Sequence, residues 1–161
     1  MAIRMKGGYF DRAYDDPTEL INDARRALES VNYDTMVGTG LSGALVIPTL
    51  AKALGKTFLI IRKDSENNHS GLQAEGELGD RWIFVDDFIS SGATKRRVMD
   101  VVEQIVENHS YRNYNFTTNK YERSDVTFVG SYMYTRARGF TPNSELDEDD
   151  IYHVSRQISL F

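Results

Sequence analysis

The sequence contains no cysteine among its 161 residues. This absence excludes a disulfide framework, a thiolate zinc site and a cysteine nucleophile. Long hydrophobic runs are also missing. The chain contains no stretch of 18 apolar residues, which is about the length needed to cross a membrane. The N-terminal segment MAIRMKGGYF lacks the apolar core of a signal peptide. We therefore expect a cytoplasmic protein that has no membrane partner.

Positive charge is scarce as well, because the formal net charge is −5. This balance argues against a general nucleic-acid-binding role. The chain has only three prolines, no internal repeat and no Pro/Ser-rich linker, and its length suits one full-sized core. Hydrophobic residues make up 40% and charged residues 27%, as in ordinary globular proteins. We predict a single domain over residues 1–161.

Segments with strand and helix patterns alternate along the chain. Val98, Val101, Val102, Ile105 and Val106 follow the spacing of one helix face. The alternation predicts an α/β fold with a mainly parallel central sheet flanked by helices, in which ligands bind at the carboxyl ends of the strands. The expected strands are 33–40, 56–61, 81–87 and 125–134, with a further edge strand at 151–161, and the expected helices are about 17–30, 43–55 and 94–108.

Three polar segments have no regular periodicity. Residues 63–80 form the longest, and long loops inside compact domains tend to be functional. Residues 110–124 are rich in tyrosine, and residues 143–150 are acidic and expected to be solvated.

A glycine-rich turn, Gly38-Thr39-Gly40-Leu41-Ser42-Gly43, matches G-x-G-x-x-G between a strand and a helix. One interpretation is a dinucleotide site with a pyrophosphate on the helix N-terminus, and Arg62 and Lys63 could then meet a 2′-phosphate. The chain has little room for a second nucleotide-binding half, however. A turn that serves packing alone is the other alternative.

Two adjacent aspartates, Asp86 and Asp87, end the strand at 81–87. Buried carboxylates are costly without partners, so this pair is expected to face a ligand that presents hydroxyl groups or a metal. The following turn opens a helix and offers hydroxyls and backbone N–H groups to one anion. Carboxylates beside an anion cradle indicate a sugar phosphate. The turn consists of Ser90, Ser91, Gly92, Ala93 and Thr94.

The run 83–94 resembles the phosphoribosyl pyrophosphate (PRPP) motif of type I phosphoribosyltransferases. It departs from the usual pattern in that Phe88 is bulkier than an aliphatic residue and Ser91 stands where threonine is commoner. The resemblance extends over about 33–106. It implies a single-domain type I phosphoribosyltransferase fold with a core of about 17–134 and a small hood that recognises the base. The hood candidates are 1–15, 110–124 and 139–161.

The resemblance also implies roles for individual residues. Asp86 and Asp87 would bind the ribose hydroxyls and Mg²⁺, directly or through water, while Ser90 to Thr94 would hold the 5′-phosphate. The catalytic residues would be Lys63, His69 and Asp87. Pyrophosphate would be bound by Thr39, Gly40, Leu41, Ser42, Arg62 and Lys63.

The loop at 63–80 is most similar to the orotate branch of the family. Arg62, Lys63, His69 and Gly71 match its Arg-Lys-x-x-Lys-x-His-Gly pattern, but the loop is two residues longer and the second lysine has no counterpart. Lys63, or a basic residue of a neighbouring subunit, could fill this gap. The candidates are Lys95, Arg96 and Arg97.

These features together predict a Mg²⁺-dependent transfer of 5-phosphoribosyl from PRPP to a nucleobase, with release of pyrophosphate, by a homodimer. Ser90 stands where 6-oxopurine branches carry an aspartate, so an orotate-like pyrimidine is favoured. The alternative is a PRPP-binding or nucleotide-binding regulatory protein with weak catalysis, which the missing lysine would favour.

Overall fold

Six strands form the central sheet of the computed structural model, in the order β3-β2-β1-β4-β7-β8. Four of them run parallel: β2 (Thr57–Ile61), β1 (Thr35–Thr39), β4 (Arg81–Asp86) and β7 (Thr127–Met133). The edge strands β3 (Ala74–Gly76) and β8 (Phe140–Pro142) are antiparallel to their neighbours. The mainly parallel α/β sheet predicted from the sequence is thus confirmed. The structure describes residues 11–63, 73–87, 91–112, 114–115, 117–118, 120–121, 125–135 and 139–143.

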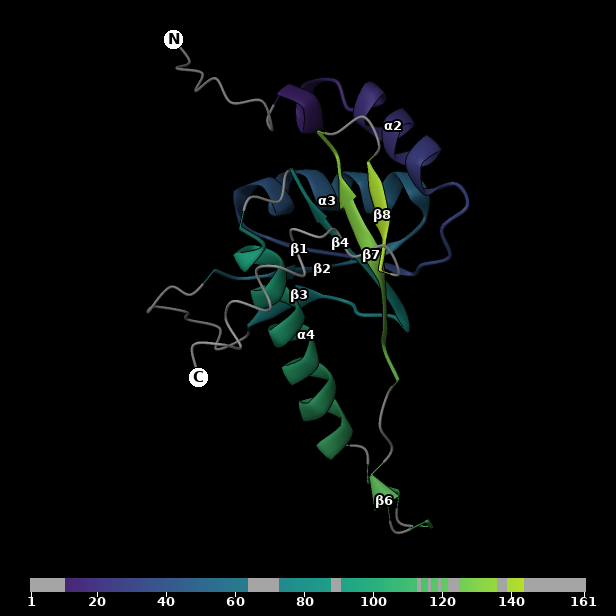
Figure 1. Cartoon of the computed structure of the whole chain (residues 1–161), viewed down its shortest axis with the longest axis vertical. Helices are drawn as coiled ribbons and strands as arrows, with labels where there is room; N and C mark the ends of the chain where they lie inside the picture. Colours follow the sequence, from purple (N-terminus) through teal and green to yellow (C-terminus); the bar gives the residue numbers. More distant parts are fainter. Residues whose placement is uncertain are drawn as a thin grey trace.

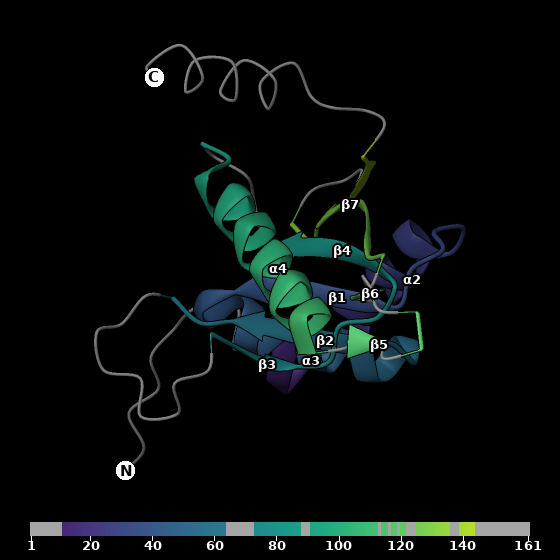
Figure 2. The same cartoon turned by 90° about the horizontal axis from the view of Figure 1, so that it is seen from below.

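Helices cover both faces of the sheet (Figures 1 and 2). The short π-helix η1 (Asp11–Asp15), α2 (Thr18–Leu28) and α3 (Gly40–Leu54) lie on one face. The other face carries α4 (Ala93–Arg112). The end of α4 and a small hairpin of β5 (Tyr114–Asn115) and β6 (Lys120–Tyr121) project beyond the sheet (Figure 1).

Two apolar clusters, one on each face, hold these layers together. On the α3 face, residues such as Met36, Ile83 and Tyr132 pack against the helices. On the α4 face, Val98 and Val102 are buried, while Val101, Ile105 and Val106 are partly buried against the same cluster. The predicted apolar face of this helix is therefore confirmed. Burial of apolar surface on both faces is the main stabilising contribution to such a fold.

The helix expected at 43–55 begins three residues earlier, at Gly40. The glycines suggested a loop, but Gly43 lies inside the helix and is buried, and a Cβ placed on it would make only ordinary contacts, the nearest 3.4 Å from the backbone of Gly38. The burial of this helix against β1 therefore outweighs the weak helix propensity of glycine. Pro48 lies inside this helix, and Gly55 ends it in the left-handed conformation, with φ +65°.

The predicted loop at 63–80 is also interrupted by structure. Residues 74–76 form β3, which pairs with the outer edge of β2. A three-residue strand leaves almost no pattern in sequence, and the open edge of β2 is what supplies its hydrogen-bond partners. Similarly, β8 takes the edge position beside β7. The edge strand predicted at 151–161 lies outside the described residues.

Parts of the predicted hood ranges belong to the core layers. Ala13, in the range 1–15, is buried in the cluster on the α3 face, and β8, in the range 139–161, is a strand of the central sheet. The hairpin of β5 and β6 lies within the third range, 110–124. Among the helices that the structure describes, each is too short or too polar to cross a bilayer.

A matched pair of leucines on α3 tests this packing. Leu50 is 0% exposed and Leu41 is 70% exposed. Leu50→Ala should lower the free energy of unfolding by about 2–5 kcal/mol, because it leaves a cavity in the core. Leu41→Ala should change it by less than about 0.5 kcal/mol. Urea unfolding followed by circular dichroism measures both, and equal losses for the two variants would contradict this placement of α3.

Candidate functional site

The first part of the site is the junction where β1 runs into α3. An added Cβ on Gly38 would lie 2.4 Å from Ile47 Cδ1 and 2.7 Å from the carbonyl oxygen of Val85. Only glycine therefore allows β1, α3 and β4 to approach so closely. Gly40 has φ +73°, a conformation that favours glycine and that turns the chain into the helix. Packing thus accounts for Gly38, the first glycine of the motif, and backbone conformation accounts for Gly40, the middle one.

Thr39 precedes α3 but does not cap it. Its buried hydroxyl donates a 2.6 Å hydrogen bond to the carbonyl oxygen of Ile61, which ties β1 to β2. The first backbone N–H groups of a helix have no partner within the helix. Without a side-chain cap from Thr39, these groups and the positive end of the helix dipole are suited to an anion.

Lys63, just after β2, lies over this helix start. A Cβ placed on Gly40 would be 2.9 Å from Lys63 Cε and 3.2 Å from Lys63 Nζ. An ammonium group at the positive end of a helix is unfavourable unless an anion joins it. The structure therefore brings Lys63 and Gly40 together, two of the residues predicted to bind pyrophosphate.

The aspartate pair lies at the carboxyl end of β4, next to the same junction. Asp86 Oδ1 accepts hydrogen bonds from the Asp87 N–H at 2.9 Å and from the Ser42 hydroxyl at 3.4 Å. Both aspartates are half-buried. Burial above all, with contributions from the Asp87 side chain, raises the pKa of Asp86 from 3.8 to about 6, while the bonds from the Asp87 N–H and Ser42 oppose the shift. A carboxylate in this position is costly to ionise and gains from a ligand that hydrogen-bonds to it or carries positive charge.

The second predicted anion cradle is the turn that opens α4. Ser91 Oγ accepts from the Ala93 N–H at 3.4 Å, and Gly92 is buried with φ +70°. Thr94 is exposed in the first turn of the helix. Arg96 donates to the Ser91 carbonyl oxygen at 3.1 Å and so holds the turn. Ser90 lies outside the described residues, as does His69.

The remaining predicted residues take other positions. Arg62 forms an ion pair with Glu75 of β3, so its guanidinium is engaged within the sheet edge. Leu41 is exposed on the first turn of α3. A contact that sequence reasoning missed comes from the end of β7, where the Thr135 hydroxyl donates to the Asp87 carbonyl oxygen and the Tyr134 N–H donates to that of Asp86 at 3.2 Å. The only sequence signal for this contact is that Thr135 follows a predicted strand.

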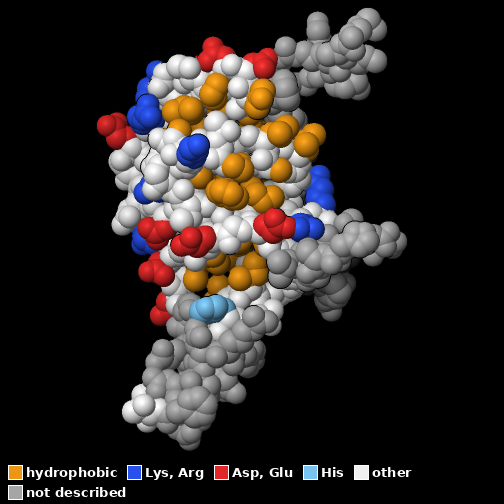
Figure 3. All heavy atoms as spheres, turned by 180° about the vertical axis from the view of Figure 1, so that it is seen from behind, with side chains coloured by type: hydrophobic (Ala, Val, Ile, Leu, Met, Phe, Trp, Pro, Cys, Tyr) orange, Lys and Arg blue, Asp and Glu red, His pale blue; other side chains and the backbone are white. Residues whose placement is uncertain are grey.

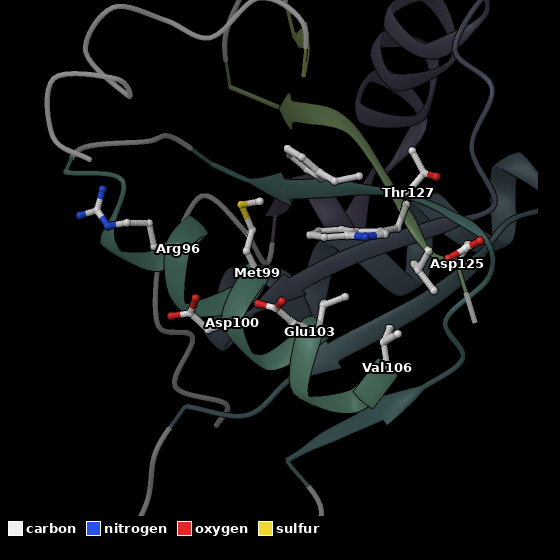
Figure 4. Close-up of a pocket in the computed structure, with 11 residues that line it drawn as sticks. Arg96, Met99, Asp100, Glu103, Val106, Asp125 and Thr127 are labelled. Atoms are coloured by element: carbon white, nitrogen blue, oxygen red, sulfur yellow. The ribbon is translucent and has the colours of Figure 1, made fainter. Parts of the chain in front are cut away.

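A pocket of about 720 Å³ lies elsewhere, between α4 and the start of β7 (Figure 4). Met99 reaches into it from α4 (Figure 4). Trp82 and Phe128, whose ring centres are 4.7 Å apart, also line it. Carboxylates from both sides surround it, including Asp100 and Asp125. Of the residues that line this pocket, only Arg96 was named for the site by the sequence, as a basic residue that could act in a neighbouring subunit. The hydrogen-bonded strand ends, rather than this hollow, therefore form the candidate site.

In sequence, the chain is similar to adenine and orotate phosphoribosyltransferases. The chain is 30% identical over 104 aligned residues to an adenine phosphoribosyltransferase of Acetivibrio thermocellus, with 54% of this chain and 61% of that protein covered. It is 28% identical over 78 residues to an orotate phosphoribosyltransferase of Pyrococcus furiosus, with 47% and 43% covered. The chain thus spans only about half the length of these relatives. No family model matches it.

The fold agrees with these sequence matches. Adenine phosphoribosyltransferase of Saccharomyces cerevisiae, solved with an imino-altritol bisphosphate and adenine, superposes with a TM-score of 0.50 at 22% identity. The superposition covers 81% of this chain and 79% of that one. The chain therefore has the type I phosphoribosyltransferase fold that the motif at 83–94 indicated, and its sequence is similar to adenine and orotate enzymes of that family.

The raised pKa of Asp86 makes a prediction for stability. Above pH 6 the native protein must bury a charged Asp86, so this side chain favours folding below its unfolded pKa of 3.8 and loses that contribution as pH rises through about 6. Asp86→Asn should therefore stabilise the protein more at pH 7.5 than at pH 4. Thermal unfolding of both proteins at the two pH values measures the difference, and an equal effect at both would refute the shift.

Proposed function

We propose that this protein is a phosphoribosyltransferase, which transfers 5-phosphoribosyl from PRPP to a nitrogenous base and releases pyrophosphate. One observation carries the proposal. The Ser42 hydroxyl joins Asp86 to the first turn of α3, where Lys63 lies over Gly40. Carboxylates that can bind sugar hydroxyls therefore lie next to a positively charged site that can bind an anion. A ribose that carries pyrophosphate requires both.

PRPP, the phosphoribosyl donor, would lie across the carboxyl ends of β1 and β4. Asp86 and Asp87 would accept hydrogen bonds from the ribose 2′- and 3′-hydroxyls. The turn Ser91–Gly92 and the first turn of α4, with Thr94, would hold the 5′-phosphate through hydroxyl and backbone N–H groups. Pyrophosphate would lie on the start of α3 beneath Lys63.

The reaction would break the bond between ribose C1′ and the pyrophosphate oxygen and form one from C1′ to a base nitrogen. Positive charge develops on the ribose ring as the bond breaks, and negative charge on the leaving pyrophosphate. Asp86 and Asp87 would stabilise the positive charge on the ribose ring. Lys63 and the N-terminus of α3 would stabilise the negative charge on the pyrophosphate. These residues would act by positioning and electrostatic stabilisation. Roles for His69 and Ser90 remain predictions from the family resemblance.

Magnesium fits the residues that are present. Adjacent carboxylates are the oxygen ligands that Mg²⁺ prefers, and Asp86 is a carboxylate whose ionisation a cation would favour. Among the described residues no group of three or more metal-ligating side chains occurs. Asp86 and Asp87 would therefore hold the ion together with oxygens of PRPP, directly or through water. The ion would neutralise charge on the leaving pyrophosphate.

The accepted base is proposed to be an orotate-like pyrimidine ahead of any 6-oxopurine. Ser90 cannot exchange a proton with a purine nitrogen as a carboxylate can, and the loop at 63–80 resembles the orotate branch. The sequence relatives include both adenine and orotate enzymes, so adenine is the principal competitor.

A PRPP-binding regulator is the second candidate function. The loop resembling the orotate branch lacks one lysine, and the Arg62 guanidinium forms an ion pair with Glu75. Both features would weaken stabilisation of the leaving group. Such a protein would bind PRPP and turn it over slowly or not at all.

A cytoplasmic homodimer is part of the proposal. The face that carries α3 exposes a group of apolar side chains (Figure 3). Along α3 itself, Ala44 is exposed and Leu45 and Pro48 are half-buried. Apolar surface of this kind is typical of a protein–protein contact, and a second copy of the chain is the proposed partner. Sedimentation of the wild type as a monomer at micromolar concentration would refute it.

Binding of PRPP tests the role of the aspartates. With Mg²⁺ present, Asp86→Asn combined with Asp87→Asn should weaken PRPP binding by about 10²–10⁴-fold, because two hydrogen bonds to charged carboxylates are lost. Wild-type affinity should also fall as pH drops through about 6, where Asp86 takes up a proton. Calorimetry that finds equal affinity for wild type and variant would refute the sugar site.

Turnover with a panel of bases tests the reaction itself. Pyrophosphate release from saturating PRPP should be fastest, by kcat/KM, with orotate, and slower with uracil, adenine, hypoxanthine and guanine. Hypoxanthine or guanine as the best substrate would contradict the argument from Ser90. Tight PRPP binding without turnover of any base would favour the regulator.

A further inference from the structure

Arg97 connects α4 to the end of β2. It projects from the second turn of α4, is half-buried, and donates a hydrogen bond from Nη2 to the carbonyl oxygen of Arg62. That carbonyl belongs to the peptide bond that links Arg62 to Lys63. The guanidinium therefore holds the backbone immediately before the lysine that covers the start of α3.

Other contacts fix the same stretch of chain. The Ile61 carbonyl oxygen accepts from the Thr39 hydroxyl, and the Arg62 N–H donates to the Gln73 carbonyl oxygen at 2.9 Å. The Arg62 side chain is held by Glu75. The hydrogen bond from Arg97 reaches the last peptide group before Lys63, and it comes from the helix whose first turn belongs to the second proposed anion cradle.

The charge of Arg97 strengthens this role. A hydrogen bond from a guanidinium to a carbonyl is charge-assisted, and it is stronger than one between neutral groups. Because Lys63 Nζ lies 3.2 Å from the Cβ position of Gly40, a small shift of the Arg62–Lys63 peptide would carry the ammonium away from the helix start. A misplacement of about 1 Å can cost on the order of 10²-fold in rate.

We propose that Arg97 is a positioning residue that sets the place of Lys63 over the N-terminus of α3, and thereby the affinity of the site for pyrophosphate. This inference rests on the proposed function. It assigns to Arg97 a role within its own chain, in place of the contact with a neighbouring subunit that the sequence suggested. The guanidinium acts through the Arg62 carbonyl and not on the ligand.

Calorimetry with inorganic pyrophosphate and, separately, ribose 5-phosphate tests the proposal on the full chain. Arg97→Met should weaken pyrophosphate binding by about tenfold, since a charge-assisted hydrogen bond is lost. Binding of ribose 5-phosphate, whose proposed site is the aspartate pair and the first turn of α4, should change by less than about twofold. Arg97→Lys keeps a cation and a donor and should recover part of the pyrophosphate affinity.

A double-mutant cycle separates positioning from general support of the fold. Once Lys63→Met has removed the ammonium group, adding Arg97→Met should lower the pyrophosphate affinity little further. If Arg97 had a merely structural role, the two losses of affinity would add. Gln104→Met is the matched control, because Gln104 is another polar α4 side chain with a hydrogen bond toward this sheet edge, accepting from the Gln73 side chain at 3.4 Å. It should leave pyrophosphate affinity unchanged.

The outcomes distinguish this inference from the proposed function. If wild type binds PRPP while Arg97→Met keeps full pyrophosphate affinity, or the two losses add, the positioning role is overturned and the proposed function stands. Equal loss of pyrophosphate and ribose 5-phosphate binding also overturns it. If wild type binds none of the three ligands, the proposed function and this inference both fail. Should Arg97→Met not fold, Arg97→Lys in the same cycle gives the decisive comparison.

Discussion

Parallel pairing of β1 with both β2 and β4 is the constraint on which the rest of the site depends. The registers Thr39↔Ile61 and Val37↔Phe84 bring three strand ends to one edge of the sheet. Gly38 makes this spacing possible, because a side chain there would collide with Ile47 and with the Val85 carbonyl oxygen. Lys63, the start of α3 and Asp86 come from three distant parts of the chain, and they adjoin one another only because these strands pair in this order.

Charge is distributed unevenly across that edge. The half-buried aspartates lie on one side, and Lys63 with the N-terminus of α3 lies on the other. Each side is costly without a ligand, since burial disfavours the charged form of Asp86 and the helix dipole disfavours an ammonium group at its positive end. A single molecule that carries hydroxyl groups and a phosphate anion relieves both costs. The electrostatics of the edge therefore favour the class of ligand proposed above by an argument that does not depend on the similarity to phosphoribosyltransferases.

The first turns of α3 and α4 contribute in different ways. In α3 the capping position is held by Thr39, whose hydroxyl donates to the Ile61 carbonyl oxygen of β2 and not to the helix. The start of α3 is therefore suited to an external anion. In α4, Arg96 and Arg97 extend their guanidinium groups to the Ser91 and Arg62 carbonyl oxygens. Cations near a helix N-terminus oppose the dipole, and here they fix the two turns that would carry the phosphate groups. Helix α4 thereby connects the proposed phosphate and pyrophosphate subsites.

The sequence by itself determined the class of fold, the order of the main strands and helices, and the identity of the aspartate pair. These features are local: apolar periodicity, glycine turns and two carboxylates at the end of a strand can be read within a dozen residues. Tertiary structure alone decided that Thr39 bonds to β2, that Arg62 pairs with Glu75, that α3 begins at Gly40, and that β3 and β8 form the sheet edges. Each of these depends on residues far apart in the chain, and the partner of a hydrogen bond or an ion pair across a sheet leaves no periodic signal in either segment.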